Sequence, residues 1–257
     1  MWRISAGVLV CCAVSAASGQ SYNIDFGDAG DAPGSSYAAA GLKGVWNTLG
    51  VPTPGVYYPL VNLQGQATGA ELYNIGGTQI LSTDNGATSG DHDALMDDML
   101  IGFNNPIDVC IWVRNLPPGS YEVMIYAMTP NDAALMSRTR VDFANEGPAF
   151  VGGAWPGGHQ LLTTYSRFTV TIGGNTIGLH SGLQNGLIQS GINGIQIRRL
   201  KTGDTNGDAV VNIQDLLNVV AGWGPCPSDP PMCAGDITGD QNVNIQDLLA
   251  VVANWGT

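Results

Sequence analysis

Two stretches near the end of the chain carry oxygen-bearing side chains at the same spacing. Residues 203–224 and 235–256 are offset by 32 positions and differ at six of 22, so 16 positions are identical. Oxygen donors at positions 1, 3, 5, 9 and 12 of a tight loop suit a hard cation, which prefers carboxylate, amide and carbonyl ligands. The pattern therefore predicts two calcium ions. The predicted ligands are Asp204, Asn206, Asp208, the Val210 carbonyl, Asn212 and Asp215 in the first loop, and Asp236, Thr238, Asp240, the Asn242 carbonyl, Asn244 and Asp247 in the second.

Both loops depart from the usual pattern of a calcium-binding EF-hand loop. Position 6, where glycine eases a sharp turn, holds Ala209 and Gln241, and position 12 is Asp rather than the longer Glu. Thr238 supplies a neutral hydroxyl where an acid or an amide is usual. We therefore expect the second loop to bind calcium more weakly than the first.

An apolar run with helical spacing follows each loop. Its members are Leu216, Leu217, Val219, Val220 and Trp223 in the first copy and Leu248, Leu249, Val251, Val252 and Trp255 in the second. One such helix cannot bury its apolar face alone, so we expect the two to pack together around a pseudo-twofold axis. Gly224 and Gly256 stand where the helices are expected to end.

The duplicated pattern Gly-Asp-x-Asn-Gly-Asp-x-x-Val-Asn-x-x-Asp-Leu-Leu, over residues 203–257, resembles a dockerin domain. The resemblance implies a pair of calcium loop-helix units that docks onto a cohesin domain of another protein. It also implies recognition through loop positions 10 and 11, which are Ile213 and Gln214 in one half and Ile245 and Gln246 in the other. Because these pairs are identical, either half could present the same face. The alternative is that the loops only fold a small terminal domain that has no partner.

The N-terminus and the cysteines indicate in which cellular compartment the protein is expected to be. Residues 1–19 have one positive charge, a short apolar stretch and then small residues, which is typical of a secretory signal peptide. The apolar stretch is too short to span a membrane, so we expect a secreted protein that is extracellular or at the cell surface. In an oxidising compartment Cys226 and Cys233 could close a short disulfide loop. Metal binding by these thiols is less favoured, because no second thiol or histidine pair is near in the sequence.

Charge excludes one class of partner. The formal net charge is −12, and residues 203–257 contain seven Asp and neither Lys nor Arg. A phosphate backbone is bound by clustered basic side chains, so a nucleic-acid partner is not expected. The same acidity indicates that folding of the terminal segment depends on cations.

Residues 20–200 read as a mainly β domain. Short β-rich runs alternate with Gly, Pro and Asn turns, and residues 91–100 are the one predicted helical segment there. The runs at 107–113 and 121–126, joined by Leu-Pro-Pro-Gly-Ser, are predicted to form two antiparallel strands around a tight connection. Together with the closing run Gly-Ile-Asn-Gly-Ile-Gln-Ile at 191–197, they resemble galactose-binding-like jelly-roll sandwiches. That resemblance implies a β-sandwich and, for many such domains, carbohydrate binding at one end.

Candidate ligand contacts lie in the glycine-rich loop 152–159. An exposed indole can stack on a sugar ring, so Trp155 is the first candidate and His159 the second. The alternative for Trp155 is a lid folded back on the core. Trp46, Trp112, Trp223 and Trp255 have apolar neighbours and are predicted to be core residues.

The densest ionisable cluster is Asp91, His92, Asp93, Asp97 and Asp98. A solvated, cation-binding acidic turn is favoured over a catalytic carboxylate pair, because neighbours on a helix point in different directions. No nucleophile elbow, zinc motif or phosphate-binding glycine loop is present. The sequence thus favours a secreted, non-catalytic module that binds polysaccharide and docks through its terminal pair. The alternatives are a polysaccharide-degrading hydrolase of O-glycosyl bonds and a purely structural surface protein.

Overall fold

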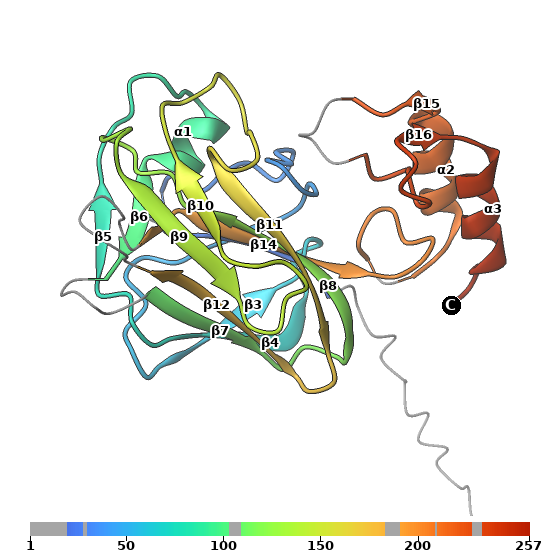
Figure 1. Cartoon of the computed structure of the whole chain (residues 1–257). Coiled ribbons are helices and arrows are strands. Elements are labelled where there is room, and N and C mark those ends of the chain that lie inside the picture. Colours follow the sequence, from blue (N-terminus) through green and yellow to red (C-terminus); the bar gives the residue numbers. More distant parts are fainter. Residues whose placement is uncertain (1–19, 28–29, 103–108, 183–190, 209, 228–232) are drawn as a thin grey trace, which may run out of the picture.

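The computed structural model describes residues 20–27, 30–102, 109–182, 191–208, 210–227 and 233–257. The predicted signal peptide, residues 1–19, and Ala209 lie outside these ranges. A β-sandwich carries a small helical unit beside it at the C-terminal end of the chain (Figure 1).

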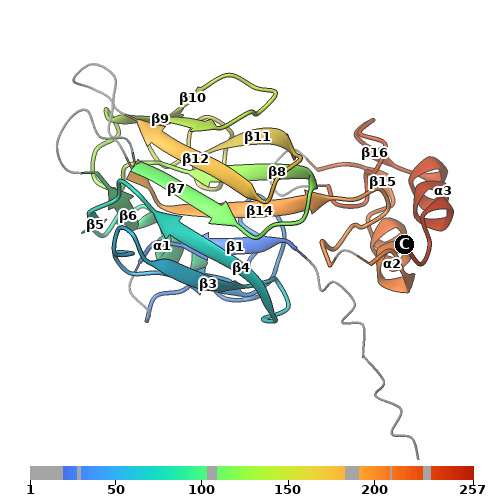
Figure 2. The same cartoon turned by 90° about the horizontal axis from the view of Figure 1, so that it is seen from below.

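Two sheets form the sandwich, as the view in Figure 2 shows. The five-stranded sheet has the order β11 (Tyr165–Ile172), β8 (Gly119–Tyr126), β14 (Gly194–Leu200), β1 (Tyr22–Asp25) and β2 (Trp46–Thr48). The six-stranded sheet has the order β10 (Ala149–Gly152), β9 (Met136–Val141), β12 (Thr176–Gly182), β7 (Val109–Arg114), β4 (Ala67–Asn74) and β3 (Tyr57–Val61). A third sheet at one end has the order β13 (Gly191–Ile192), β6 (Asp98–Ile101) and β5 (Gln79–Ser82). The predicted mainly β sandwich is confirmed.

The core follows from the period-2 pattern of the strands. Tyr121, Val123 and Ile125 of β8 are fully buried on one face, and Ile111 and Val113 of β7 oppose them from the other sheet. Alternate residues of each strand thus meet between the layers, as in other sandwiches.

One predicted local pairing is wrong. Strands β7 and β8 do not form a hairpin, because β7 pairs with β12 and β4 while β8 pairs with β11 and β14. The Pro-Pro connection instead carries the chain from one sheet to the other. Both strands have apolar faces that must be buried against each other, and only two stacked layers allow that.

The predicted helix at 91–100 is shorter than expected. Helix α1 spans Asp91–Met96, and the chain then continues as strand β6. Strands β2, β6 and β10 were not predicted, because each has only three or four residues and too little pattern for recognition from sequence.

The terminal unit is built from α2 (Ile213–Ala221), α3 (Ile245–Ala253) and the short pair β15 (Gly224–Pro225) and β16 (Asn242–Val243). Val211, Val219, Val243 and Val251 form its buried core, with Leu216 and Leu248 packed against them. The helices end at Ala221 and Ala253, earlier than the glycine positions had suggested.

Gly224 and Gly256 act as pairing positions rather than helix caps. Gly224 pairs with Val243 of the second half, and the Gly256 N–H donates to the Val211 carbonyl of the first half at 2.8 Å. The end of each half therefore pairs with the loop of the other half.

The first loop rests on the sandwich. A side chain at Gly207 would bring its Cβ within 2.8 Å of a Leu42 methyl and 2.9 Å of Ser21 Oγ, so only glycine allows this approach. A cavity of about 710 Å³ lies alongside, between residues 38–43 and the terminal unit. Among the described residues no helix is both long and apolar enough to cross a membrane.

Candidate functional site

The oxygen donors of the first loop converge through hydrogen bonds within the loop. Asp204 Oδ1 accepts from the Gly207 N–H at 2.8 Å and the Asp208 N–H at 3.2 Å. Asn206 Oδ1 accepts from the Asp208 N–H at 2.9 Å, and the Asn206 amide donates to Asp208 Oδ2 at 3.1 Å. Asp215 Oδ1 accepts from the Thr205 N–H at 2.8 Å and so lies at the other end of the same loop.

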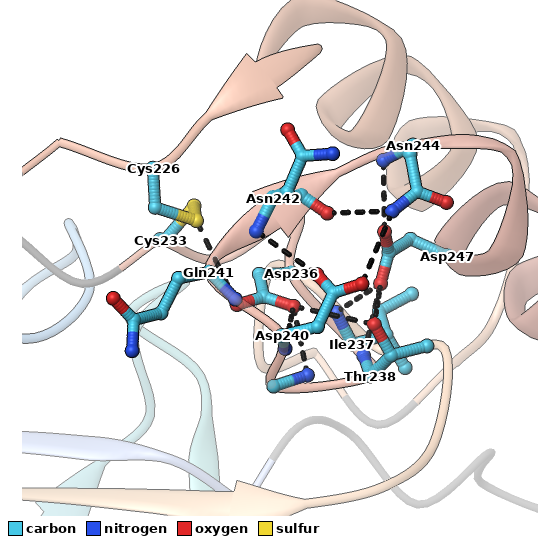
Figure 3. Close-up of a disulfide and its surroundings, with 11 residues drawn as sticks. Cys226, Cys233, Asp236, Ile237, Thr238, Asp240, Gln241, Asn242, Asn244 and Asp247 are labelled. Atoms are coloured by element: carbon cyan, nitrogen blue, oxygen red, sulfur yellow. Dashed lines mark hydrogen bonds between the residues drawn. A yellow bond between two sulfur atoms is a disulfide. The ribbon is translucent and has the colours of Figure 1, made fainter.

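Figure 3 shows the corresponding donors in the second loop. Asp236 Oδ1 accepts from the Gly239 and Asp240 N–H groups, at 2.7 and 3.1 Å. The Thr238 hydroxyl lies 3.4 Å from Asp236 Oδ1 and 3.0 Å from Asp247 Oδ1. Asn244 donates to Asp240 Oδ2 at 3.3 Å and to the Asn242 carbonyl at 2.9 Å. These hydrogen bonds link the oxygen-bearing side chains within one loop, and oxygen donors of these types are the ligands that calcium prefers.

The residues at positions 9 and 12 of each loop have a second structural role, which was not predicted from the sequence. Asn212 and Asn244 are the N-caps of α2 and α3, and Asp215 and Asp247 complete a capping box at each helix start. Four of the predicted calcium ligands therefore also start the two helices. The signal in the sequence is the Asn-x-x-Asp spacing just before each apolar run.

Electrostatics favour the ionised form of the last ligand. Burial raises the pKa of Asp247, but N–H groups of Asn244, Thr238 and Ile237 donate to the carboxylate and leave the pKa below its ordinary value. Gln241, at position 6, has a φ of 65°, the left-handed conformation that glycine adopts more easily.

The two loops differ in exposure. Asp204 and Thr205 of the first loop are buried, whereas Thr238, Gly239 and Asp240 of the second are exposed. The first loop therefore has a drier surrounding, in which carboxylate–cation attraction is stronger.

The outward faces of α2 and α3 carry matching apolar rows. The exposed residues, here named the helix rows, are Ile213, Leu217 and Val220 of α2 with Trp223 just after it, and Ile245, Leu249 and Val252 of α3 with Trp255 just after it. Trp223 and Trp255 are 54% and 48% exposed, so the prediction that they belong to the core is wrong. The two helices pack together through their buried valines, Val219 and Val251. The exposed indoles are not part of that core. Gln214 and Gln246 are exposed beside the rows.

The structure pairs Cys226 with Cys233 in a disulfide, seven residues apart. The Cys226 sulfur lies 3.7 Å from Asp236 Oδ2, so the crosslink is next to the first predicted ligand of the second loop (Figure 3).

Replacing both cysteines with serine should lower the free energy of unfolding of the terminal unit by about 2.5 kcal/mol, the chain-entropy value for so short a loop. Thermal melts followed by far-ultraviolet circular dichroism would measure it. Parent protein in reductant should behave like the variant, and equal melting of all three samples would contradict a bracing role.

On the sandwich, Trp155 and His159 join an aromatic cluster assembled from distant segments. The Tyr37 hydroxyl lies 2.6 Å from His92 Nδ1 and 2.5 Å from His159 Nε2. Trp155 is half-buried and its ring centroid lies 5.1 Å from that of His92. His159 is only 7% exposed, so a ligand at this loop would meet Trp155 before His159.

The buried imidazole makes stability depend on pH. Burial, helped by His92, lowers the pKa of His159 to about 3, well below its unfolded value. The unfolded chain then binds the extra proton, so this contribution is complete above pH 6.5 and is lost as the pH falls towards 3.

Between pH 7 and pH 5 the loss should be about 2 kcal/mol. Urea unfolding of the full chain at the two pH values, in parent and His159→Gln, would measure it. The variant should lose less stability than the parent, and an equal loss in both would contradict this assignment.

A second aromatic group lies on the outer face of the six-stranded sheet. Tyr57, Tyr73 and Trp112 are cross-strand neighbours on β3, β4 and β7, with ring centroids 4.7 and 6.0 Å apart. Trp112 is 43% exposed, which corrects its prediction as a core residue. Ile111 and Val113 point inwards, so the residue between them must point outwards. The alternation of inward and outward residues along the strand was the feature of the sequence that could have predicted an exposed Trp112.

Polar groups flank this aromatic row. The Arg114 guanidinium lies 4.2 Å from the Tyr57 ring centroid and Arg114 Nε lies 3.4 Å from Glu71 Oε2. On the other side, Trp112 is paired with Gly178, which has no side chain. Asp142 occupies the space over that glycine.

Asp142 anchors a small polar network there. Arg140 donates to Asp142 Oδ1 at 2.8 Å, and His180 Nε2 lies 3.0 Å from Asp142 Oδ2. The Trp112 indole thus lies next to the hydrogen-bonding groups of Asp142, Arg140 and His180 on one face of the sheet. These four residues are here called the sheet-face site.

The predicted acidic cluster divides between two surroundings. Asp91 accepts from the Gly34 N–H at 2.7 Å and His92 faces Tyr37, whereas Asp93, Asp97 and Asp98 line a separate cavity. The five residues do not form one site.

No family model matches the chain, and no curated protein matches it. Among solved structures, it is similar to protein YxiM from Bacillus subtilis, with 12% identity, a TM-score of 0.40, and coverage of 75% of this chain and 42% of that one. It is also similar to the ANX2 ectodomain from Arabidopsis thaliana, with 14% identity, a TM-score of 0.44, and coverage of 72% of this chain and 50% of that one. A β-glucuronidase from Bacteroides uniformis is similar with 13% identity, a TM-score of 0.37, and coverage of 61% of this chain and 20% of that one. The chain spans half or less of the length of each of these proteins. Similarity at this level does not indicate activity or ligand.

Proposed function

We propose that this chain is a secreted, non-catalytic module whose terminal unit binds two calcium ions and docks, like a dockerin, onto a cohesin-like domain of another protein. The observation that carries the proposal is the duplication of an all-oxygen loop together with a matching exposed apolar row on each helix.

The helix rows are costly to leave in water. Burying a large aliphatic or aromatic side chain contributes roughly 1.5–3 kcal/mol, and each row exposes four such residues. A contiguous apolar surface of this kind is typical of a protein interface. Calcium supports the interface indirectly, because the last loop ligands also cap the helices that display the rows.

Binding of the calcium-loaded full chain to a panel of immobilised cohesin domains tests the proposal. We expect at least one member to bind in calcium, with loss of binding after chelation and recovery on adding calcium back. Calcium uptake without binding to any member would reduce the terminal unit to a structural element.

For the sandwich, we propose a polysaccharide ligand at the sheet-face site. The specific support is an exposed indole beside Gly178, with the Asp142 network at hydrogen-bonding reach of sugar hydroxyls. This placement differs from the loop position expected for Trp155, and the two can be compared directly.

Trp112→Ala should weaken retention by the preferred polysaccharide at least tenfold in affinity gel electrophoresis, whereas Trp155→Ala should change it little. Both variants remove one indole, so each is the matched control of the other. The reverse order of effects would move the ligand to the 152–159 loop. Release of reducing ends from the same polysaccharide would instead favour the hydrolase alternative.

A further inference from the structure

A second acidic region lies within the sandwich, away from the terminal loops. Asp84, Asp93 and Asp97 each place a carboxylate oxygen within 4.8 Å of the others. They line a cavity of about 260 Å³ between α1 and the β5–β6 edge, together with Asp31 and Asp98.

Hydrogen bonds account for only part of this negative charge. The Thr88 hydroxyl lies 2.9 Å from Asp93 Oδ1 and 3.1 Å from Asp97 Oδ1. In the part of the chain that the structure describes, the ion pairs of Lys, Arg and His involve Glu71, Glu122 and Asp142 instead of these aspartates.

The inner wall of the cavity holds the observation that points to a ligand. Asp98 is 6% exposed, and its Oδ1 has no hydrogen-bond partner. Behind it, Asp25 is 1% exposed, and the Thr48 hydroxyl lies beside its carboxylate.

Unpartnered buried carboxylates cost several kcal/mol each unless they are neutralised or paired. Protonation would relieve one or two groups but would leave the others repelling. A divalent cation offsets several carboxylates at once, and hard oxygen donors of this kind select calcium over softer metals.

We propose that this cavity is a third calcium site, held by Asp84, Asp93 and Asp97, with the unpartnered carboxylate of Asp98 on the wall behind them. The ion would tie helix α1 and strand β6 to the loop before them. The site serves the sandwich and does not depend on the function proposed for the terminal unit.

Calcium titration calorimetry on the metal-stripped full chain tests this. The parent should bind three ions, Asp93→Asn/Asp97→Asn two, and Asp204→Ala/Asp236→Ala one. If the Asp93→Asn/Asp97→Asn variant binds as many ions as the parent, the proposal is wrong. If the parent binds one ion that only this variant loses, the cavity site stands and the terminal loops fail instead.

Thermal unfolding is a second test, because the double variant is expected to differ from the parent in opposite directions without and with calcium. Without calcium, Asp93→Asn/Asp97→Asn should melt at or above the parent, because like charges have been removed; with calcium it should lack the rise in Tm that the parent sandwich shows. Asp132→Asn, an exposed substitution of the same type outside the cavity, should keep the rise. If the double variant fails to fold, Asp84→Asn at the exposed rim decides: it should weaken one binding event about tenfold, and unchanged binding would overturn the proposal.

Discussion

Replacing Asp204 and Asp236 with alanine should abolish calcium binding by the terminal unit and melt helices α2 and α3. Each change removes the anionic first ligand, whose Oδ1 also holds the turn of its loop through two backbone N–H groups. Residues 203–257 contain no Lys or Arg that could balance the remaining aspartates. Folding and metal binding are therefore expected to be coupled.

Calorimetry on the full chain, combined with circular dichroism at the helical minimum, would measure both effects. Affinity at the two terminal loops should fall at least a hundredfold, and the helical signal of the calcium-loaded parent should be lost. Asp132→Ala, on an exposed loop of the sandwich, is the matched control and should leave both unchanged. Undiminished calcium binding in the double variant would refute the assignment of the loops.

The single variants separate the two loops. The first is buried against the sandwich and the second is exposed with a threonine at position 3. We expect Asp236→Ala to remove the weaker event and Asp204→Ala the stronger one. The opposite order would show that the sandwich opposes rather than favours loading of the first loop.

Alanine at Ile213, Gln214, Ile245 and Gln246 together should abolish docking while sparing calcium. All four side chains are exposed at the helix starts and outside the valine core, so their removal costs the fold little. Changing only Ile213 and Gln214, or only Ile245 and Gln246, should weaken binding about twofold, because the intact half still presents the same row. The fourfold variant should lose at least a hundredfold.

Surface plasmon resonance against a cohesin domain that binds the parent would measure these ratios, and calorimetry would verify that both terminal loops still take up calcium. A complete loss from either half-variant would contradict two equivalent faces. Full affinity in the fourfold variant would show that recognition lies elsewhere on the unit.

The repeat was predictable because its chemistry is local. Ligand spacing, the helix starts and the apolar runs all lie within about a dozen residues, so the sequence alone specifies two loops, each followed by a helix. The mainly β class of the sandwich was likewise predictable from alternating runs and turn residues. The same alternation places Tyr121, Val123 and Ile125 on one face of their strand.

What the sequence could not determine depends on partners distant along the chain. The Pro-Pro turn looked like a hairpin, but β7 and β8 lie in different sheets because both have faces to bury. Trp112, Trp223 and Trp255 looked like core residues, but all three are exposed. Trp112 lies on the outer face of its strand, and Trp223 and Trp255 lie outside the valine core of the terminal unit.

The sequence by itself therefore determined the duplicated acidic loops, the helices that follow them and the β class of the domain, since neighbouring residues fix them. Only the tertiary structure decided which indoles face solvent, how Asp25 and Asp98 come together beneath the acidic cavity, and how the sheet-face site is assembled. Burial and electrostatic repulsion between residues far apart in sequence have no local signature, because they arise only when the strands pack.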